Sequence, residues 1–293
     1  MKDSTGGKIF NVVNYSLLTV LTLTFIVPFL ILLSTSLVSE QELIRRGSFI
    51  LVPEKLDFTS YATLLSQGSA LYQSYGITIM RTTAGTALNL IFTAMMAYGL
   101  SRKTLPGRKI IVTLVFISML FGGGLVPTYL LMKFLHLTNT FWVMIFPSLI
   151  SAWYLLIMRS FFSQIPESLE ESATLDGASP LRVLVSIIIP VSMPMLATIG
   201  LFYGVTHWNA WFDATIYITS SDLMPLQVFL RRIVLTMTNQ DLDSSILLNM
   251  KEQATPQALR GAMIMITTIP IMCVYPFLQK HFIKGVLVGS VKG

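Results

Sequence analysis

The sequence predicts an all-α polytopic membrane protein with about six transmembrane helices. Of its 293 residues, 53% are apolar and only 12% are charged, whereas about 25% of residues are charged in soluble domains. The apolar residues gather into runs of roughly 20, the number that a helix needs to cross about 30 Å of hydrocarbon. These runs lack the alternation of barrel strands, and a helix satisfies all of its own backbone groups in lipid.

Six such runs follow one another along the chain. They are Asn11 to Leu37, Tyr75 to Leu100, Ile110 to Leu135, Phe141 to Phe162, Val183 to Val205 and Leu259 to Phe282. The first run is too long for the apolar core of a signal peptide, so we expect a retained helix. The whole chain, 1–293, is predicted to form one transmembrane domain, with core spans at about 75–282 and outer loops at about 38–74 and 206–257.

Helix-disrupting residues fall inside five of these runs. They are Pro28, Gly122-Gly123-Gly124 with Pro127, Pro147, Pro190 with Pro194, and Pro270. Kinks are tolerated in lipid where neighbours satisfy the freed carbonyls, and transport proteins use them to build moving cavities. Irregular packing is the simpler explanation of each one taken singly.

The distribution of cations predicts that both termini face the cytoplasm. With that orientation the inner segments hold Lys2, Lys8, Arg102, Lys103, Arg108, Lys109, Arg159, Arg182, Lys280, Lys284 and Lys292. The outer segments hold Arg45, Arg46, Lys55, Arg231, Arg232, Lys251 and Arg260, spread over two longer loops in which acids match them. The net charge of +6 therefore indicates membrane anchors and no nucleic-acid partner.

A short amphipathic helix is predicted on the cytoplasmic surface, in the segment 165–180 between the fourth and fifth runs. Pro166 fits the first turn of a helix, and the Glu residues after it suit the positive N-terminal end. Gly177 supplies a turn and Pro180 prevents simple continuation. A solvated loop helix accounts for these features equally well.

The residues of this segment closely resemble the EAA motif of ABC-importer permeases. Acid, small residue, Asp-Gly and distal Pro fall at the expected spacing in Glu171-Ser172-Ala173, Asp176-Gly177-Ala178 and Ile187-Ile188-Ile189-Pro190. Ser172 replaces the usual Ala, and Leu184 stands where Phe is frequent. The resemblance implies a type I importer fold and a coupling helix that contacts an ATPase through Glu170, Glu171, Ser172, Ala173, Asp176, Gly177, Ala178 and Pro190.

The chain's ending, from Tyr275 to Gly293, is similar to that of carbohydrate-importer permeases related to the maltose system, and closest to the subgroup for complex and lipo-oligosaccharides. The resemblance implies that the tail 283–293 reaches between ATPase subunits through Gly285, Gly289 and Gly293. A frayed terminus is the alternative. The implied substrate is an oligosaccharide, and an anionic one such as alginate oligomers if Arg81 or its partners line the path.

Partners and cofactors follow from what the sequence lacks. No phosphate loop of the Gly-x-x-x-x-Gly-Lys-Ser/Thr type occurs, so ATP and Mg²⁺ are expected on a separate ATPase dimer, with no cofactor in this chain. The family further implies a second homologous permease, an extracytoplasmic solute-binding protein, membrane lipid around the spans, and a location in the bacterial cytoplasmic (inner) membrane. The chain itself is expected not to be an enzyme.

Polar and aromatic residues at membrane depth are candidates for the translocation pathway. They are Arg81, Asn89, Trp153, Tyr154, His207, Trp208, Asn209, Trp211 and Asp213. Arg81 could equally reach the outer interface as a snorkelling cation, and Asn89 is more often an interhelical hydrogen bond. An aromatic belt explains the tryptophans alone, although aromatic rings beside amides and carboxylates also suit sugars.

Two other classes of protein fit the sequence less well. A membrane-embedded enzyme needs clustered acids or histidines, but His136, His207 and His281 lie far apart without metal-ligand spacing, so no metal site is expected. A channel or an ion-driven secondary transporter would favour paired acids within the spans, and the six runs contain no Asp or Glu. The segment that resembles the EAA motif speaks against both.

Overall fold

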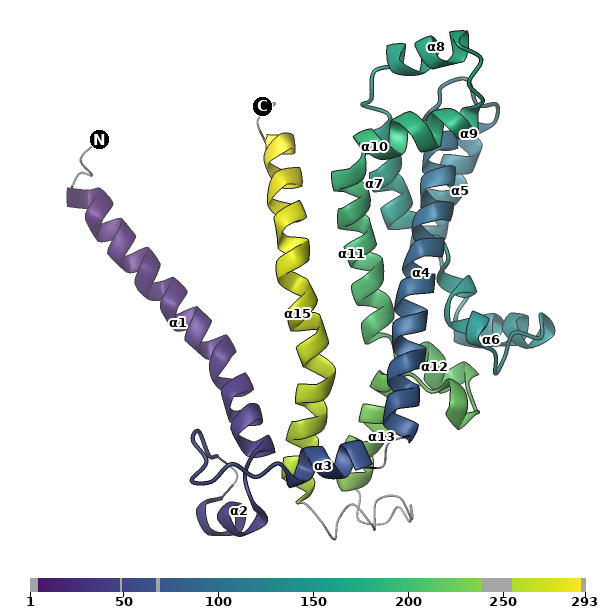
Figure 1. Cartoon of the computed structure of the whole chain (residues 1–293). Helices are drawn as coiled ribbons and strands as arrows, with labels where there is room; N and C mark the ends of the chain where they lie inside the picture. The colour runs from purple at the N-terminus through teal and green to yellow at the C-terminus, as the bar shows by residue number, and fades with distance from the viewer. Residues whose placement is uncertain (1–4, 48, 67–68, 239–254, 291–293) are drawn as a thin grey trace. The chain divides into compact units, whose positions relative to one another are not determined.

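The computed structural model describes residues 5–47, 49–66, 69–238 and 255–290, and within these ranges all regular structure is helical, as predicted. The α-helices are α1 (Thr5–Ser36), α2 (Glu40–Arg46), α3 (Thr59–Ser66), α4 (Ser69–Ser101), α5 (Arg108–Leu120), α6 (Leu125–Phe134), α7 (Ala152–Phe162), α8 (Ser168–Leu175), α9 (Pro180–Val183), α10 (Ile189–Val191), α11 (Met193–Asn209), α12 (Phe212–Tyr217), α13 (Leu226–Thr238) and α15 (Pro256–Ser290) (Figure 1). Short 3₁₀ helices η1 (Phe141–Met144), η2 (Phe146–Ser148) and η4 (Ser221–Leu223) and a π-helical turn, η3 (Leu184–Ile188), complete the described elements.

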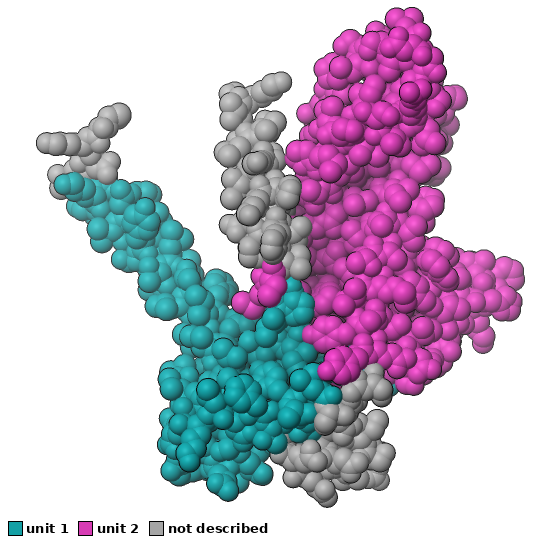
Figure 2. Space-filling model, viewed as in Figure 1, with its two compact units in different colours: residues 1–71, 230–270 teal, residues 72–229, 271–293 magenta. Residues whose placement is uncertain are grey.

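The chain forms two compact units (Figure 2). Unit 1 comprises Met1–Leu71 and Leu230–Pro270, and unit 2 comprises Tyr72–Phe229 and Ile271–Gly293. Compactness alone does not show that each part folds independently. The single transmembrane domain expected from the sequence therefore stays a prediction.

Within the described part of the chain, two uninterrupted helices are long and apolar enough to cross a bilayer, in α1 and α4. Among the described residues, up to five spans result if each of three bent helix pairs counts as one. These five elements correspond to the first five predicted runs. The sixth run, Leu259 to Phe282, falls within the single long helix α15.

Sharp bends interrupt the third, fourth and fifth runs. The bend is 117° between α5 and α6, 53° between the 3₁₀ segment at Phe141–Ser148 and α7, and 87° between Pro180–Val191 and α11. The breaks lie at the Gly122-Gly123-Gly124 run, just after Pro147, and between Pro190 and Pro194, where kinks were expected. Pro28 lies within unbroken α1, and Pro270 lies within unbroken α15.

Unit 1 is organised around the C-terminal end of α1. Ser36 is fully buried, and its hydroxyl shares a 2.8 Å hydrogen bond with Tyr61. A Cβ atom on Gly261 of α15 would lie 3.0 Å from the Leu32 carbonyl oxygen, so glycine permits this close approach of α15 to α1. Most of α1 presents exposed apolar side chains, as expected of a helix that faces lipid.

Unit 2 has two buried clusters, and α8 and α12 lie toward opposite ends of α4 (Figure 1). The cluster nearer α8 joins α4, α7, the π-helical turn and α11 through residues such as Ala97, Phe162, Ile188 and Tyr203. The cluster nearer α12 joins α4, α6, η1 and α12 through Ile77, Met132, Met144 and Tyr217. Tight packing at both ends positions the polar groups described below.

Glu42 of α2 ties together the loop that follows α1. Its carboxylate accepts hydrogen bonds from the Glu54 backbone amide at 3.0 Å and from Arg46 at 2.6 Å. The bond from the Glu54 amide, assisted by Arg46, lowers the pKa of the Glu42 carboxyl below its usual 4.5 against the opposing effect of burial. The contribution of Glu42 to stability is therefore present above pH 4.5 and is lost as the pH falls through the native pKa.

We predict that Glu42→Gln removes this pH dependence. Hydrogen exchange of the peptide 40–58, corrected for the intrinsic rate, should show protection that falls with acid in the native chain and is low at every pH in the variant. Glu40→Gln, at an exposed neighbouring position, serves as the control and should behave like the native chain. Acid sensitivity that survives in Glu42→Gln would contradict the assignment.

Candidate functional site

The predicted coupling helix exists as α8, and its two faces differ. Ala173 and, just after the helix, Ala178 pack against the buried cluster of α4, α7 and α11. On the other face Glu171, Ser172 and Asp176 are exposed, and Leu175 is 89% exposed. These four side chains form the face of α8 that the subunit itself leaves open.

Local sequence explains how α8 begins and ends. Its first turn carries Glu170 and Glu171, which favour the positive end of the helix. At the other end Gly177 has φ +79°, and the amides of Gly177 and Ala178 donate to the carbonyls of Thr174 (3.0 Å) and Ala173 (2.9 Å). This is a Schellman termination, which requires the left-handed conformation that glycine adopts without strain.

The distal part of the motif returns to the membrane through a π-helical turn at Leu184–Ile188. Pro190 lacks the amide proton that would bond to the carbonyl four residues earlier, which favours this local change of pitch. Leu184, at the position where the motif often has Phe, is buried in the same cluster as Ala97. Pro190 itself is exposed, within the short helix α10.

Glu170 and Glu171 are adjacent but have different surroundings. Glu170 points inward and forms an ion pair with Arg102, and its Oε2 accepts a 3.5 Å hydrogen bond from the Tyr98 hydroxyl. Burial raises the pKa of the Glu170 carboxyl, and the Arg102 guanidinium opposes that rise. Of the two, only Glu171 presents an exposed side chain to a partner.

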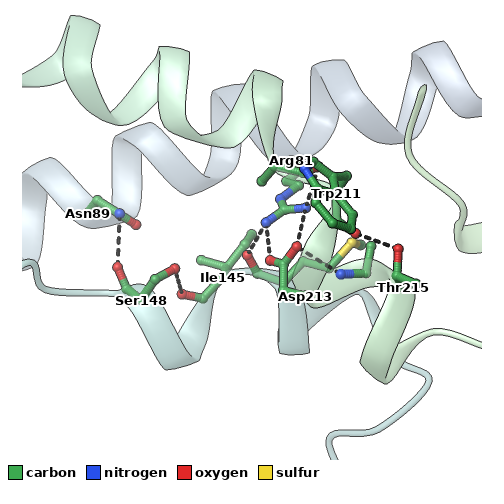
Figure 3. Close-up of polar contacts among 10 residues, drawn as sticks. Arg81, Asn89, Ile145, Ser148, Trp211, Asp213 and Thr215 are labelled. Carbon is green, nitrogen blue, oxygen red and sulfur yellow. Dashed lines mark hydrogen bonds and ion pairs between the residues drawn. The ribbon is translucent and has the colours of Figure 1, made fainter. Parts of the chain in front are cut away.

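At the opposite end of unit 2, Arg81 and Asp213 form an ion pair (Figure 3). The Arg81 side chain is 2% exposed. Its NH1 group donates to Asp213 Oδ1 at 3.2 Å, and NH2 donates to Asp213 and, at 3.2 Å, to the Met144 carbonyl. Arg81 is therefore an internal cation neutralised by Asp213, and it does not extend to the interface as a snorkelling side chain.

Asn89 of α4 and His207 of α11 are both buried. Asn89 is buried and donates to the Ser148 carbonyl at 3.2 Å, the interhelical bond that its position suggested (Figure 3). His207 is 3% exposed and packs over Gly85, where an added Cβ would lie 2.5 Å from its Nε2. These two pathway candidates are enclosed by the subunit itself.

The aromatic candidates divide between packing and exposure. Tyr154 stacks on Phe202 and meets Tyr203 edge-on, with ring centres 5.7 Å and 4.8 Å apart. Trp208 packs edge-on against Tyr75 at 6.4 Å. The remaining candidates on these elements are more open: Trp153 is 60% exposed, Asn209 is exposed and bonds to the Val205 carbonyl, and Trp211 is partly buried.

A cavity of about 190 Å³ adjoins the ion pair. Asp213 and Tyr217 of α12 line it together with Ser148 and apolar residues such as Phe212. Polar groups beside aromatic rings suit a sugar, although the Asp213 carboxylate is already matched by Arg81. None of the residues that line the cavity is a cation, so the cavity offers no positive charge to an anionic ligand.

Two of the predicted tail positions fall in the last helix. Gly285 and Gly289 lie in the last turns of α15, and Gly293 lies outside the described residues. Within the ranges described, no group of three or more His, Cys, Asp or Glu side chains could hold a metal ion.

Sequence reasoning named Arg81 and Asp213 singly but missed that they pair. It also counted Arg102 only as a membrane anchor and passed over Tyr98. The available signal for the first pair was a cation and an acid predicted at the outer ends of different spans, since such charges are costly in lipid unless they pair. For Arg102 the signal was a cation-rich turn and an acid-rich segment on the same side of the membrane.

Known proteins of similar sequence cover the whole chain. It is 42% identical over 298 residues to the protein LplC of Bacillus subtilis, covering 100% of this chain and 98% of that protein. It is 39% identical over 289 residues to the polygalacturonan/rhamnogalacturonan transport system permease protein YtcP of the same organism, covering 98% and 99%. No protein-family model matches the chain.

A solved structure agrees with the fold over nearly all of its length. A chain of a bacterial ABC transporter involved in the import of the acidic polysaccharide alginate superposes with a TM-score of 0.88 at 29% identity, covering 96% of this chain and 99% of that one. The structural match thus extends over the same part of the chain as the sequence matches.

We predict that Asp213→Asn destabilises the protein by about 3 kcal/mol, because it leaves the buried Arg81 charge unpaired. This value is the low end of the range for buried ion pairs, since the Asp213 side chain is 30% exposed. Denaturant titration in detergent would measure the loss. The double variant Arg81→Met, Asp213→Leu should recover most of it. Asp222→Asn, at an exposed carboxylate of the same unit, is the control; an equal loss there would contradict the account.

Proposed function

Because the chain belongs to the family of carbohydrate ABC-transporter permeases, we propose that it forms half of the membrane pathway through which an acidic oligosaccharide enters the cell. The chain is an integral membrane transport subunit of an importer and not itself a catalytic enzyme. An importer permease works with an ATPase and with a binding protein that delivers the substrate. A second, homologous permease supplies the other half of the pathway in this proposal, with lipid around both.

The observation that carries the mechanism is the exposed face of α8. Leu175 and Glu171 lie four residues apart, on one side of a helix whose other side is packed on the core. We assign this face to contact with the ATPase, which holds ATP and Mg²⁺. Closure of the ATPase on ATP then moves α8. The helix before it, α7, and the segment after it, from α9 to α11, rearrange the pathway between outward-open and inward-open states.

The same assignment fixes the orientation of the chain. A contact with the ATPase requires α8 to be cytoplasmic, so that α12 at the other end of α4 lies toward the outer side. Both termini are then cytoplasmic, which agrees with the cation-rich turn Ser101–Lys109 beside α8. The outer loops at about 38–74 and 206–257 face the binding protein, and Gly285, Gly289 and Gly293 belong to the tail that reaches the ATPase.

The substrate class rests on the proteins that this chain resembles. One of them belongs to a transporter that imports the acidic polysaccharide alginate, and another is a permease of a polygalacturonan/rhamnogalacturonan transport system. Arg81 is neutralised by Asp213, so it is not available to bind a carboxylate of the substrate. Recognition of carboxylates is therefore assigned to the binding protein or the second permease. Arg81, Asn89 and His207 stabilise the pathway wall, whereas Trp153, Asn209, Trp211 and Asp213 remain candidates to touch the sugar.

The contact with the ATPase can be tested by a cysteine crosslink. In a Cys273→Ser background, which removes the one native cysteine, Leu175→Cys should form an adduct with the co-expressed ATPase whose yield changes with ATP. Ala178→Cys, partly buried against the core, is the matched control and should react less. Absence of an adduct at Leu175, in a complex that still co-purifies, would contradict the coupling assignment.

The substrate class can be tested by competition for uptake. In cells that depend on this importer, unlabelled oligogalacturonate or alginate oligomers should inhibit uptake of a labelled uronic-acid oligomer, and neutral arabino-oligosaccharides should inhibit it far less. Equal inhibition by the neutral oligomers would contradict the acidic class and leave the transport function itself untouched.

A further inference from the structure

The inner face of α8 meets the turn that joins α4 to α5. The Arg102 and Glu170 side chains form an ion pair, and they are only 19% and 14% exposed. The Arg102 guanidinium carbon lies 4.6 Å from the centre of the Tyr98 ring, a cation–π contact. Tyr98, on the last turn of α4, also donates a hydrogen bond to Glu170. Three side chains thus join α8 to a helix with which it has no direct covalent connection.

We propose that Arg102 and Tyr98 are positioning residues that fix α8 to α4 through Glu170, so that α4 moves with α8 when the ATPase closes. This inference rests on the proposed function. The side-chain contact gives motion of α8 a second route into the protein, because the polypeptide chain itself joins α8 only to α7 and α9. Motion of α8 then reaches α4, the helix that carries Arg81 at its other end.

The end of α4 is suited to receive such a movement. The Leu100 carbonyl oxygen accepts hydrogen bonds from Arg108 Nε of α5 at 2.9 Å and from Arg159 Nε of α7 at 3.0 Å. Two cations at the C-terminal end of a helix are also favourable for its dipole. A push on Arg102 is therefore delivered to a junction at which α4, α5 and α7 are already held together.

A neighbouring ion pair differs from the Arg102–Glu170 pair in its exposure to solvent. Lys103 and Glu167 lie 3.1 Å apart between the same two segments, but their side chains are 79% and 64% exposed. Exposed pairs of this kind are worth little, because water screens them and long side chains lose entropy. Arg102 and Glu170 are shielded and fixed by the Tyr98 ring, so they can transmit a displacement.

The proposal is tested by the ratio of saccharide molecules transported to ATP molecules hydrolysed, measured on the assembled importer in proteoliposomes. Glu170→Gln and Arg102→Gln should each lower this ratio several-fold, and the exchanged pair Glu170→Arg, Arg102→Glu should recover part of it. Arg102→Lys, which keeps the charge, should also retain part of the ratio. Glu167→Gln is the matched control and should leave the ratio unchanged.

A purely structural role would lower transport and hydrolysis in proportion and keep the ratio constant. A native ratio in Glu170→Gln, or no recovery in the exchanged pair, would overturn the proposal. If the charge variants do not assemble, Tyr98→Phe removes only one hydroxyl and should still lower the ratio; a native ratio there would count against it equally. The Leu175→Cys crosslink should persist in Glu170→Gln, whereas its absence when Glu170 is native would contradict the coupling assignment on which this proposal rests.

Discussion

The arrangement of unit 2 depends most on the pairing of Arg81 with Asp213. A cation within an apolar helix is costly unless a counter-charge and further hydrogen-bond acceptors surround it. Asp213 supplies the charge from α12, and the Met144 carbonyl supplies an acceptor at the end of η1. Because one guanidinium holds both, η1 and α12 must lie against α4. The cavity beside Asp213 is a consequence of that arrangement.

The two ends of unit 2 differ in where their polar side chains lie. Around Arg81 the polar contacts turn inward, to Asp213 and the Met144 carbonyl. Around α8 the helix has one face buried on alanines and another that presents Leu175 and Glu171 to a partner. The bends at Gly122-Gly123-Gly124 and between Pro190 and Pro194 separate short packed segments, which can rearrange more readily than one straight helix.

Much of this structure could be predicted from the sequence, because hydropathy and local turn chemistry are properties of neighbouring residues. The apolar runs gave the helices, Gly177 gave the end of α8, and the glycine and proline clusters gave the positions of the breaks. The size of the bends could not be predicted, since it depends on what each segment packs against. The sequence signalled that Arg81 and Arg102 needed acidic partners, but it did not identify Asp213 and Glu170, because only tertiary packing decides which acid meets which cation.

The most direct test of the central claim is ATP-driven accumulation of a labelled acidic oligosaccharide in proteoliposomes that contain this chain, its partner permease and the ATPase, with the binding protein outside. The account predicts uptake that requires internal ATP and is abolished by Leu175→Glu, although the variant still co-purifies with the second permease. Uptake without ATP, or native uptake by Leu175→Glu, would contradict the claim that α8 couples the ATPase to the pathway.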